Sequence, residues 1–135
     1  MKDLLSYLNA NSPYYKELFQ KNEIDINSIR TLSDLGKIPL STKDNLQLRN
    51  WDFLCVEKNQ IAEYCTTSGT LGNPVCIALT QKDLERLAYN EYQSFLTAGA
   101  TKNDIFQFML SLDRQFMAGI AYYSGVRKLG AGLVR

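Results

Sequence analysis

The residues best suited to chemistry lie together in one short loop, residues 66–74. It contains four hydroxyl side chains and two glycines. Hydroxyl and backbone N–H groups donate to phosphate oxygens, and glycine lets a phosphate approach the backbone because it lacks a Cβ atom. No Gly-Lys-Ser/Thr sequence follows the glycines, so the loop is not the P-loop of the large NTPase class. Its composition indicates either a phosphate-binding loop or a Gly/Asn/Pro turn between two strands.

A second candidate site lies in residues 111–117, where Asp113 and Arg114 directly follow a predicted buried strand. Loops at the carboxyl ends of strands often carry binding groups, so this pair is a candidate for a substrate pocket. The alternative is that the two side chains cap the helix that follows.

The sequence contains no histidine, which excludes reaction mechanisms that need an imidazole group. Serine–histidine and cysteine–histidine mechanisms are excluded, and we predict neither a catalytic nucleophile nor a metal site. The three cysteines form no CxxC pair, and their odd number argues against a disulfide framework. We expect Cys55, Cys65 and Cys76 in the core of a reduced, cytoplasmic protein.

Charge and hydropathy argue against two classes of partner. Fifteen basic side chains balance fourteen acidic ones, which leaves no basic surface of the kind that nucleic-acid binding needs. No segment approaches the roughly 18 apolar residues that span a bilayer, and we recognise no signal peptide. Nucleic acid and membrane are therefore not expected as partners.

Capping signals locate the helices that surround the loop. Ser12-Pro13 predicts a helix start, and Ser41 or Thr42 can cap a short helix. Thr80 and Asp83 have the spacing of a capping box, before a helix that continues to Gly99.

The remaining periodicity predicts strands over 61–66, 75–79 and 105–110, a helix over 115–129, and a further strand from 131. In that helix, Gly119 and Gly125 indicate close packing, and Gly130 marks its end.

These elements predict an α/β fold, in which helices pack on a β-hairpin carrying the loop and a parallel βαβ sheet begins. At 135 residues and 45% hydrophobic content, one domain with one core is expected. The unfinished sheet would expose a strand edge, through which copies of the chain could associate.

The sequence Thr-Ser-Gly-Thr-Leu-Gly-Asn-Pro at 67–74, followed by Thr80 and Asp83, resembles the signature loop of adenylate-forming enzymes. The usual form of that loop reads Ser/Thr-Ser-Gly-Thr-Thr-Gly-Lys-Pro. Flanking segments occur in the order seen in phenylacetate–CoA ligase-like proteins, which include coenzyme F390 synthetases. They are Ser12-Pro13-Tyr14-Tyr15, residues 32–35 and 38–46, Asp104 and Leu129-Gly130-Ala131.

The resemblance covers nearly the whole chain and implies that residues 1–135 are an incomplete N-terminal part of an AMP-binding (adenylation) domain, with no second domain. It implies a two-step reaction, in which a carboxylic acid attacks ATP to form an acyl-adenylate and the thiol of coenzyme A then takes the acyl group. The loop would hold the β- and γ-phosphates with Mg²⁺. The phosphate-binding positions that carry over are Thr67, Ser68, Gly69, Thr70 and Gly72.

Two positions depart from the family pattern: Leu71 replaces a hydroxyl residue and Asn73 replaces the lysine. We expect these changes to weaken phosphate contact without abolishing it. The family's magnesium-coordinating acid, ribose-binding Asp and catalytic lysine have no counterpart in this sequence, so the isolated chain is expected to be inactive. The alternative is a truncated, non-catalytic nucleotide-binding or assembly module. The identity of the acid stays open.

Overall fold

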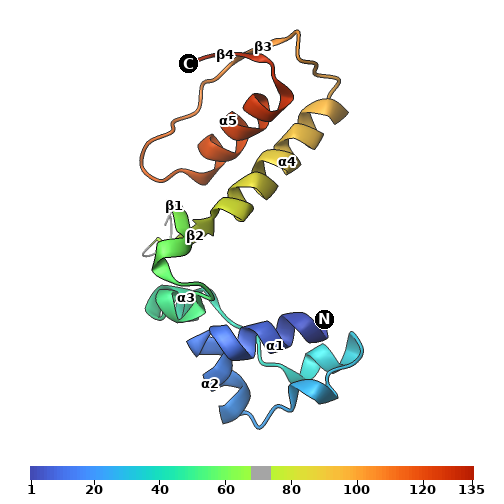
Figure 1. The fold of residues 1–135 in the computed structure, drawn as a ribbon. Helices are drawn as coiled ribbons and strands as arrows, with labels where there is room; N and C mark the ends of the chain where they lie inside the picture. Colours follow the sequence, from blue (N-terminus) through green and yellow to red (C-terminus); the bar gives the residue numbers. More distant parts are fainter. Residues whose placement is uncertain (68–73) are drawn as a thin grey trace. The chain divides into compact units, whose positions relative to one another are not determined.

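The computed structural model of the chain describes residues 1–67 and 74–135. They form two compact units, Met1–Lys58 and Asn59–Arg135 (Figure 1). The chain thus divides into two compact units, where one domain with one core was expected. None of the helices in the described part of the chain has the length and apolar composition for a bilayer crossing.

The first unit is built from helices and single helical turns around a small apolar core. Leu5, Phe19 and Ile29 are its buried centre. The predicted helix start at Ser12-Pro13 and the predicted cap at Thr42 are both confirmed. The helices are α1 (Lys2–Asn11), α2 (Pro13–Lys21) and α3 (Lys43–Leu48), and the 3-10 turns are η1 (Ile26–Ser28), η2 (Ser33–Lys37) and η3 (Asn50–Phe53).

Ser12 joins two segments of this unit. Its side chain is buried, accepts a hydrogen bond from the N–H of Tyr15 at 3.4 Å, and donates one to the carbonyl of Asp52 at 2.8 Å. Residues 50–53 are thereby fixed against the start of α2.

Replacing Ser12 by alanine is expected to destabilise the first unit by about 1–2 kcal/mol, because a helix cap is lost and the Asp52 carbonyl loses its partner. Urea unfolding followed by fluorescence of Trp51, the single tryptophan, reports on this unit. Ser6, exposed on α1, gives the matched control Ser6→Ala. Equal unfolding midpoints for the two variants would contradict the prediction.

The second unit begins with an antiparallel hairpin of β1 (Ile61–Thr66) and β2 (Cys76–Thr80), which leads into helix α4 (Gln81–Thr97). The predicted capping box is confirmed: Asp83 N–H donates to Thr80 Oγ1 at 3.3 Å, and Thr80 N–H donates to Asp83 Oδ2 at 3.0 Å. The Asp83 carboxylate accepts from the Thr80 N–H and also from Thr80 Oγ1 at 2.7 Å, and these two hydrogen bonds hold the pKa of Asp83 below its usual value.

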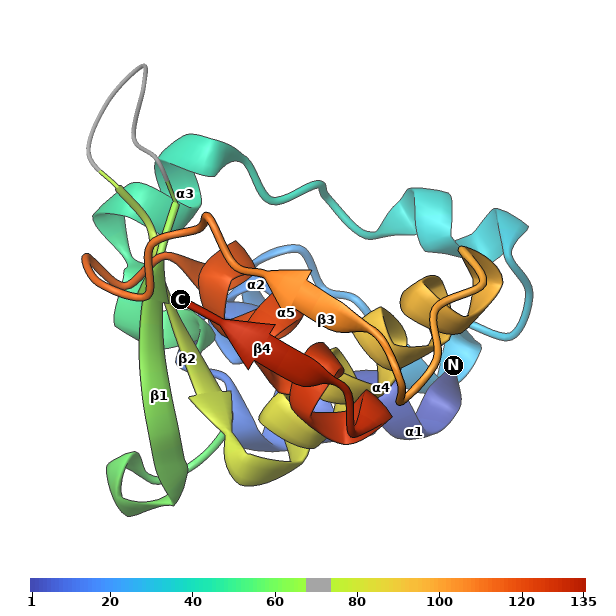
Figure 2. The same ribbon diagram turned by 90° about the horizontal axis from the view of Figure 1, so that it is seen from above.

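The predicted βαβ unit is also present. Strand β3 (Ile105–Gln107), helix α5 (Met117–Leu129) and strand β4 (Gly132–Val134) follow one another, and the two strands run parallel, with Ile105 opposite Gly132 (Figure 2). Helices α4 and α5 lie side by side (Figure 1). Gly130 ends α5 with a left-handed backbone, φ 79°.

Two predicted boundaries were wrong. The strand expected over 105–110 ends at Gln107, and Ile105 and Met109 are 76% and 83% exposed rather than buried. The strand is short because β4, its partner among the described residues, contributes three residues to the pairing. The helix expected from Gln115 begins at Met117, because Gln115 has a left-handed backbone with φ 58°.

Candidate phosphate and substrate site

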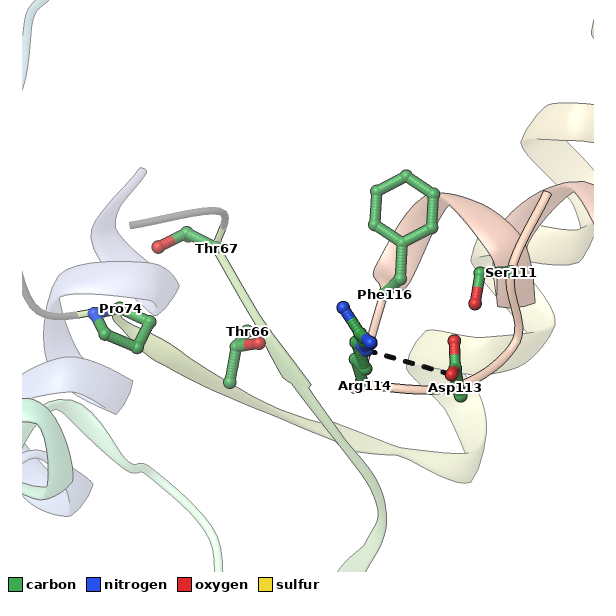
Figure 3. A pocket seen from close by; sticks show the side chains of 7 residues that line it. All are labelled: Thr66, Thr67, Pro74, Ser111, Asp113, Arg114 and Phe116. Atoms are coloured by element: carbon green, nitrogen blue, oxygen red, sulfur yellow. Dashed lines mark ion pairs between the residues drawn. The ribbon is translucent and has the colours of Figure 1, made fainter. Parts of the chain in front are cut away.

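A hollow of about 590 Å³ lies in the second unit, between the end of β1 and the loop that precedes α5. Figure 3 shows its two sides, with the residues from the hairpin facing those from the loop. The residues that line it are Thr66, Thr67, Pro74, Ser111, Asp113, Arg114 and Phe116.

Thr66 forms backbone contacts with both sides of the hollow. It pairs with Cys76 across the hairpin, and its N–H donates to the carbonyl of Gln115 at 2.9 Å. The same contact forms a parallel bridge between Thr66 and Phe116. Backbone hydrogen bonds on both edges of β1 therefore hold the hairpin and the loop at a fixed spacing.

Thr67 lies where the hairpin opens into the 68–73 segment. Its N–H donates to the carbonyl of Val75 at 3.0 Å, and its Oγ1 accepts from the N–H of Val75 at 3.0 Å. A threonine hydroxyl carries one proton in addition to its acceptor lone pairs. With Oγ1 held by Val75, that proton can be donated to an acceptor in the hollow.

The opposite side of the hollow is a turn with unusual backbone geometry. Arg114 and Gln115 have φ values of 55° and 58°, and the N–H of Phe116 closes the turn by donating to the carbonyl of Asp113 at 3.2 Å. Left-handed geometry costs a non-glycine residue about 1–2 kcal/mol. The hydrogen bond from Thr66 to the Gln115 carbonyl helps to hold it.

Asp113 and Arg114 do not cap the following helix. The N-cap of α5 is Phe116, without a side-chain hydrogen bond, so the capping alternative is wrong. The side chains of Arg114 and Asp113 are 91% and 69% exposed, and Arg114 Nε lies 3.9 Å from Asp113 Oδ2. Both charges face solvent at the hollow.

All three cysteines were expected in the core, but Cys65 is buried while Cys55 and Cys76 are half-buried. Cys65 on β1 is fully buried, and burial together with the charge of Glu63 raises the pKa of its thiol. A buried thiol with a raised pKa stays protonated and inert. Within residues 1–67 and 74–135, no cluster of three or more carboxylate and thiol side chains is arranged to hold a metal ion.

The structure thus brings Thr67, Asp113 and Arg114 to one hollow, although they come from two segments that are far apart in the sequence. The other predicted phosphate-binding positions, and both departures from the family loop, lie outside the described residues: Ser68, Gly69, Thr70, Leu71, Gly72 and Asn73.

Sequence reasoning did not select the other lining residues as binding positions. Ser111 and Phe116 belong to the same segment as Asp113, and Thr66 and Pro74 are the two ends of the predicted loop, so membership of these segments was the available signal. Their convergence depends on the hydrogen bond between residues 66 and 115, a contact that periodicity and local motifs do not encode.

No protein-family model matches the chain. Its sequence is similar to phenylacetate–coenzyme A ligases. It is 28% identical over 135 residues to the enzyme of Escherichia coli strain K12 and 27% identical to that of Thermus thermophilus. In both cases the match covers 99% of this chain. The chain spans only about a third of each relative's length, 31% of the E. coli enzyme and 30% of the T. thermophilus enzyme.

The fold is similar to that of 2-hydroxyisobutyryl-CoA ligase. An open conformation of that enzyme, in complex with 2-HIB-AMP and CoA, matches with a TM-score of 0.85 at 17% identity, covering 99% of this chain and 32% of the ligase. Its thioesterification state matches with a TM-score of 0.85 at 18% identity, covering 99% and 29%. At such identity the match concerns the fold.

Proposed function

We propose that this chain, which corresponds to the N-terminal portion of a phenylacetate–CoA ligase-like adenylate-forming enzyme, binds the nucleotide phosphates for an ATP-dependent acyl-CoA ligase. The complete enzyme would activate a carboxylic acid as an acyl-adenylate and transfer the acyl group to coenzyme A. The observation that carries the proposal is the match along 99% of the chain to phenylacetate–coenzyme A ligases.

The hollow fits the phosphate part of this reaction. Thr67 presents a hydroxyl whose oxygen is fixed by Val75, and Arg114 adds a positive charge on the opposite side. Donors held in place before the reaction stabilise charge that develops on departing pyrophosphate. When bound, Mg²⁺ would screen the phosphate charges and polarise the α-phosphate.

The proposed roles divide along the hollow. Thr67 and the loop residues Ser68, Gly69, Thr70 and Gly72 bind phosphate oxygens, and the acyl acid enters along the 111–117 segment. Coenzyme A acts in the second step of the complete enzyme. The chain spans less than a third of the E. coli relative's length, so we expect it to show no pyrophosphate exchange by itself.

Isothermal titration of the chain with Mg·ATP tests the proposal. Binding is expected to weaken by about tenfold or more in Thr67→Val, which keeps the side-chain volume and removes the hydroxyl, since one hydrogen bond to a charged group contributes about 1.5–3 kcal/mol. Thr97→Val, on the exposed end of α4, is the matched control and should bind as the parent does. Absence of saturable Mg·ATP binding by the unaltered chain would contradict the proposed function.

The same titration tests the effect of Asn73, which stands where the usual loop of adenylate-forming enzymes has lysine. Asn73→Lys restores the positive charge of the usual loop and is expected to tighten Mg·ATP binding relative to the parent chain. Unchanged affinity would show that the lysine is not needed in this protein.

A further inference from the structure

The hollow contains a positive charge that the phosphate loop itself lacks. Residues 66–74 include neither lysine nor arginine. Among the described residues that line the hollow, Arg114 is the cation and Asp113 the anion. We propose that Arg114 binds the phosphate chain of the nucleotide and supplies the positive charge that the loop does not provide. This inference rests on the proposed function.

A nucleotide triphosphate needs more than neutral donors. Hydroxyl and backbone N–H groups donate hydrogen bonds but carry no net charge, whereas a bond from a guanidinium to phosphate is about twice as strong as a neutral one. The planar guanidinium also presents paired N–H groups that match two phosphate oxygens. An arginine that lines the same hollow as Thr67 therefore supplies the charge that neutral donors lack.

The backbone of the turn holds Arg114 at the hollow, where it can bind phosphate. Its left-handed φ of 55° and that of Gln115 lie next to the hydrogen bond from Thr66 to the Gln115 carbonyl. The turn is thereby attached to the strand end from which Thr67 and the loop continue. In Figure 3, Arg114 lies on the loop side of the hollow, opposite Thr66 and Thr67.

The guanidinium is free to bind a ligand. Its ion pair with Asp113, at 3.9 Å, is longer than a hydrogen bond. Because 91% of its side chain is exposed, Arg114 contributes little to packing. Burial of this side chain therefore does not account for the strained turn. Strained backbone of this kind concentrates at binding sites, where it fixes the direction of a side chain.

The carboxylate of the acyl substrate is the competing anion for Arg114. Phosphate is favoured because Arg114 shares the hollow with Thr67 and Pro74, which lie directly on either side of residues 68–73. Mg·pyrophosphate therefore serves as a probe for the phosphate chain. Acetate and benzoate probe a carboxylate, and adenosine probes the nucleoside.

The test is titration calorimetry of the chain and its variants with these probes. Arg114→Gln is expected to weaken Mg·ATP and Mg·pyrophosphate binding by about tenfold or more, which corresponds to about 1.4 kcal/mol. Adenosine binding should be unchanged. Arg114→Lys keeps the charge without the planar fork and should retain part of the affinity. Arg86→Gln is the matched control, because Arg86 is 83% exposed on α4 and does not line the hollow.

The outcomes separate this inference from the proposed function. If Arg114→Gln binds Mg·ATP as tightly as the parent chain, the inference is overturned and the proposed function stands. An equal loss in Arg86→Gln, or a loss restricted to acetate and benzoate, also overturns it. If the parent chain binds no Mg·ATP, both the inference and the proposed function are contradicted. Circular dichroism of each variant verifies the fold, which an exposed substitution should leave intact.

Discussion

Gly125→Val is expected to destabilise the second unit by about 3 kcal/mol or more, because it inserts three carbons into the contact between α4 and α5. A Cβ at Gly125 would overlap the Cβ of Glu91 and lie 3.0 Å from the ring of Phe95. The Glu91 Cβ is attached directly to backbone, so it cannot move away unless the helix moves. The two helices would have to separate, which would remove part of the apolar packing of this unit.

Alanine at the same position gives a graded comparison. Gly125→Ala gains about 1 kcal/mol in helix propensity, but overpacking costs about 1–3 kcal/mol. The net effect should be a destabilisation smaller than that of valine. The measurement is thermal unfolding followed by near-ultraviolet circular dichroism of the tyrosines, combined with hydrogen exchange of α4 and α5.

Gly36→Ala is the control for both variants. A Cβ at Gly36 would meet no atom within 4 Å, and its φ is not in the left-handed range. This substitution should leave stability unchanged or raise it by about 0.4–1 kcal/mol, because alanine restricts the unfolded chain. Equal stability of Gly125→Val and the parent chain would show that the helices do not need this close approach.

Gly119→Ala is expected to alter the hollow as well as stability. A Cβ at Gly119 would overlap the carbonyl oxygen of Ser111 and lie 3.5 Å from Leu112 Cδ2. Because the obstructing atom belongs to the backbone, the loop that carries Ser111 must shift. We expect a destabilisation of about 1–3 kcal/mol and weaker Mg·ATP binding, since Ser111 lines the hollow.

Ala118→Gly is the matched control for this variant. It lies next to Gly119 in the first turn of α5, costs about 1 kcal/mol in helix propensity, and adds no atom against the loop. It should lower stability without changing Mg·ATP affinity. The prediction for Gly119→Ala is wrong if its titration matches that of Ala118→Gly.

The sequence by itself determined the elements that depend on neighbouring residues. The capping box at Thr80 and Asp83, the helix start at Ser12 and the helix end at Gly130 were all predicted correctly. Each depends on contacts within a few residues along the chain, which sequence spacing encodes directly. The βαβ order was inferred from the alternation of strand and helix patterns, and close packing from small residues within a predicted helix.

Tertiary structure decided the features that depend on distant segments. The hydrogen bond between Thr66 and Gln115 joins residues 49 positions apart and links the two sides of the hollow, so sequence spacing gives no sign that the loop and the Asp113–Arg114 pair share one site. The left-handed turn at Arg114 moved the start of α5 to Met117. Local propensity favours a helix at Gln115, but the hydrogen bond to β1 helps to hold the turn that precedes it.

Gly119, Gly125 and Arg114 also show which features the sequence predicts and which depend on the fold. Small residues at positions 119 and 125 indicated close contact, but only the fold identified the Ser111 carbonyl and the Glu91 side chain as the groups they approach. Likewise, residues 66–74 contain no positive charge, and only the fold brings Arg114 to the hollow beside Thr67. Residue type and spacing determined which groups could bind phosphate, and long-range backbone pairing decided which of them share one site.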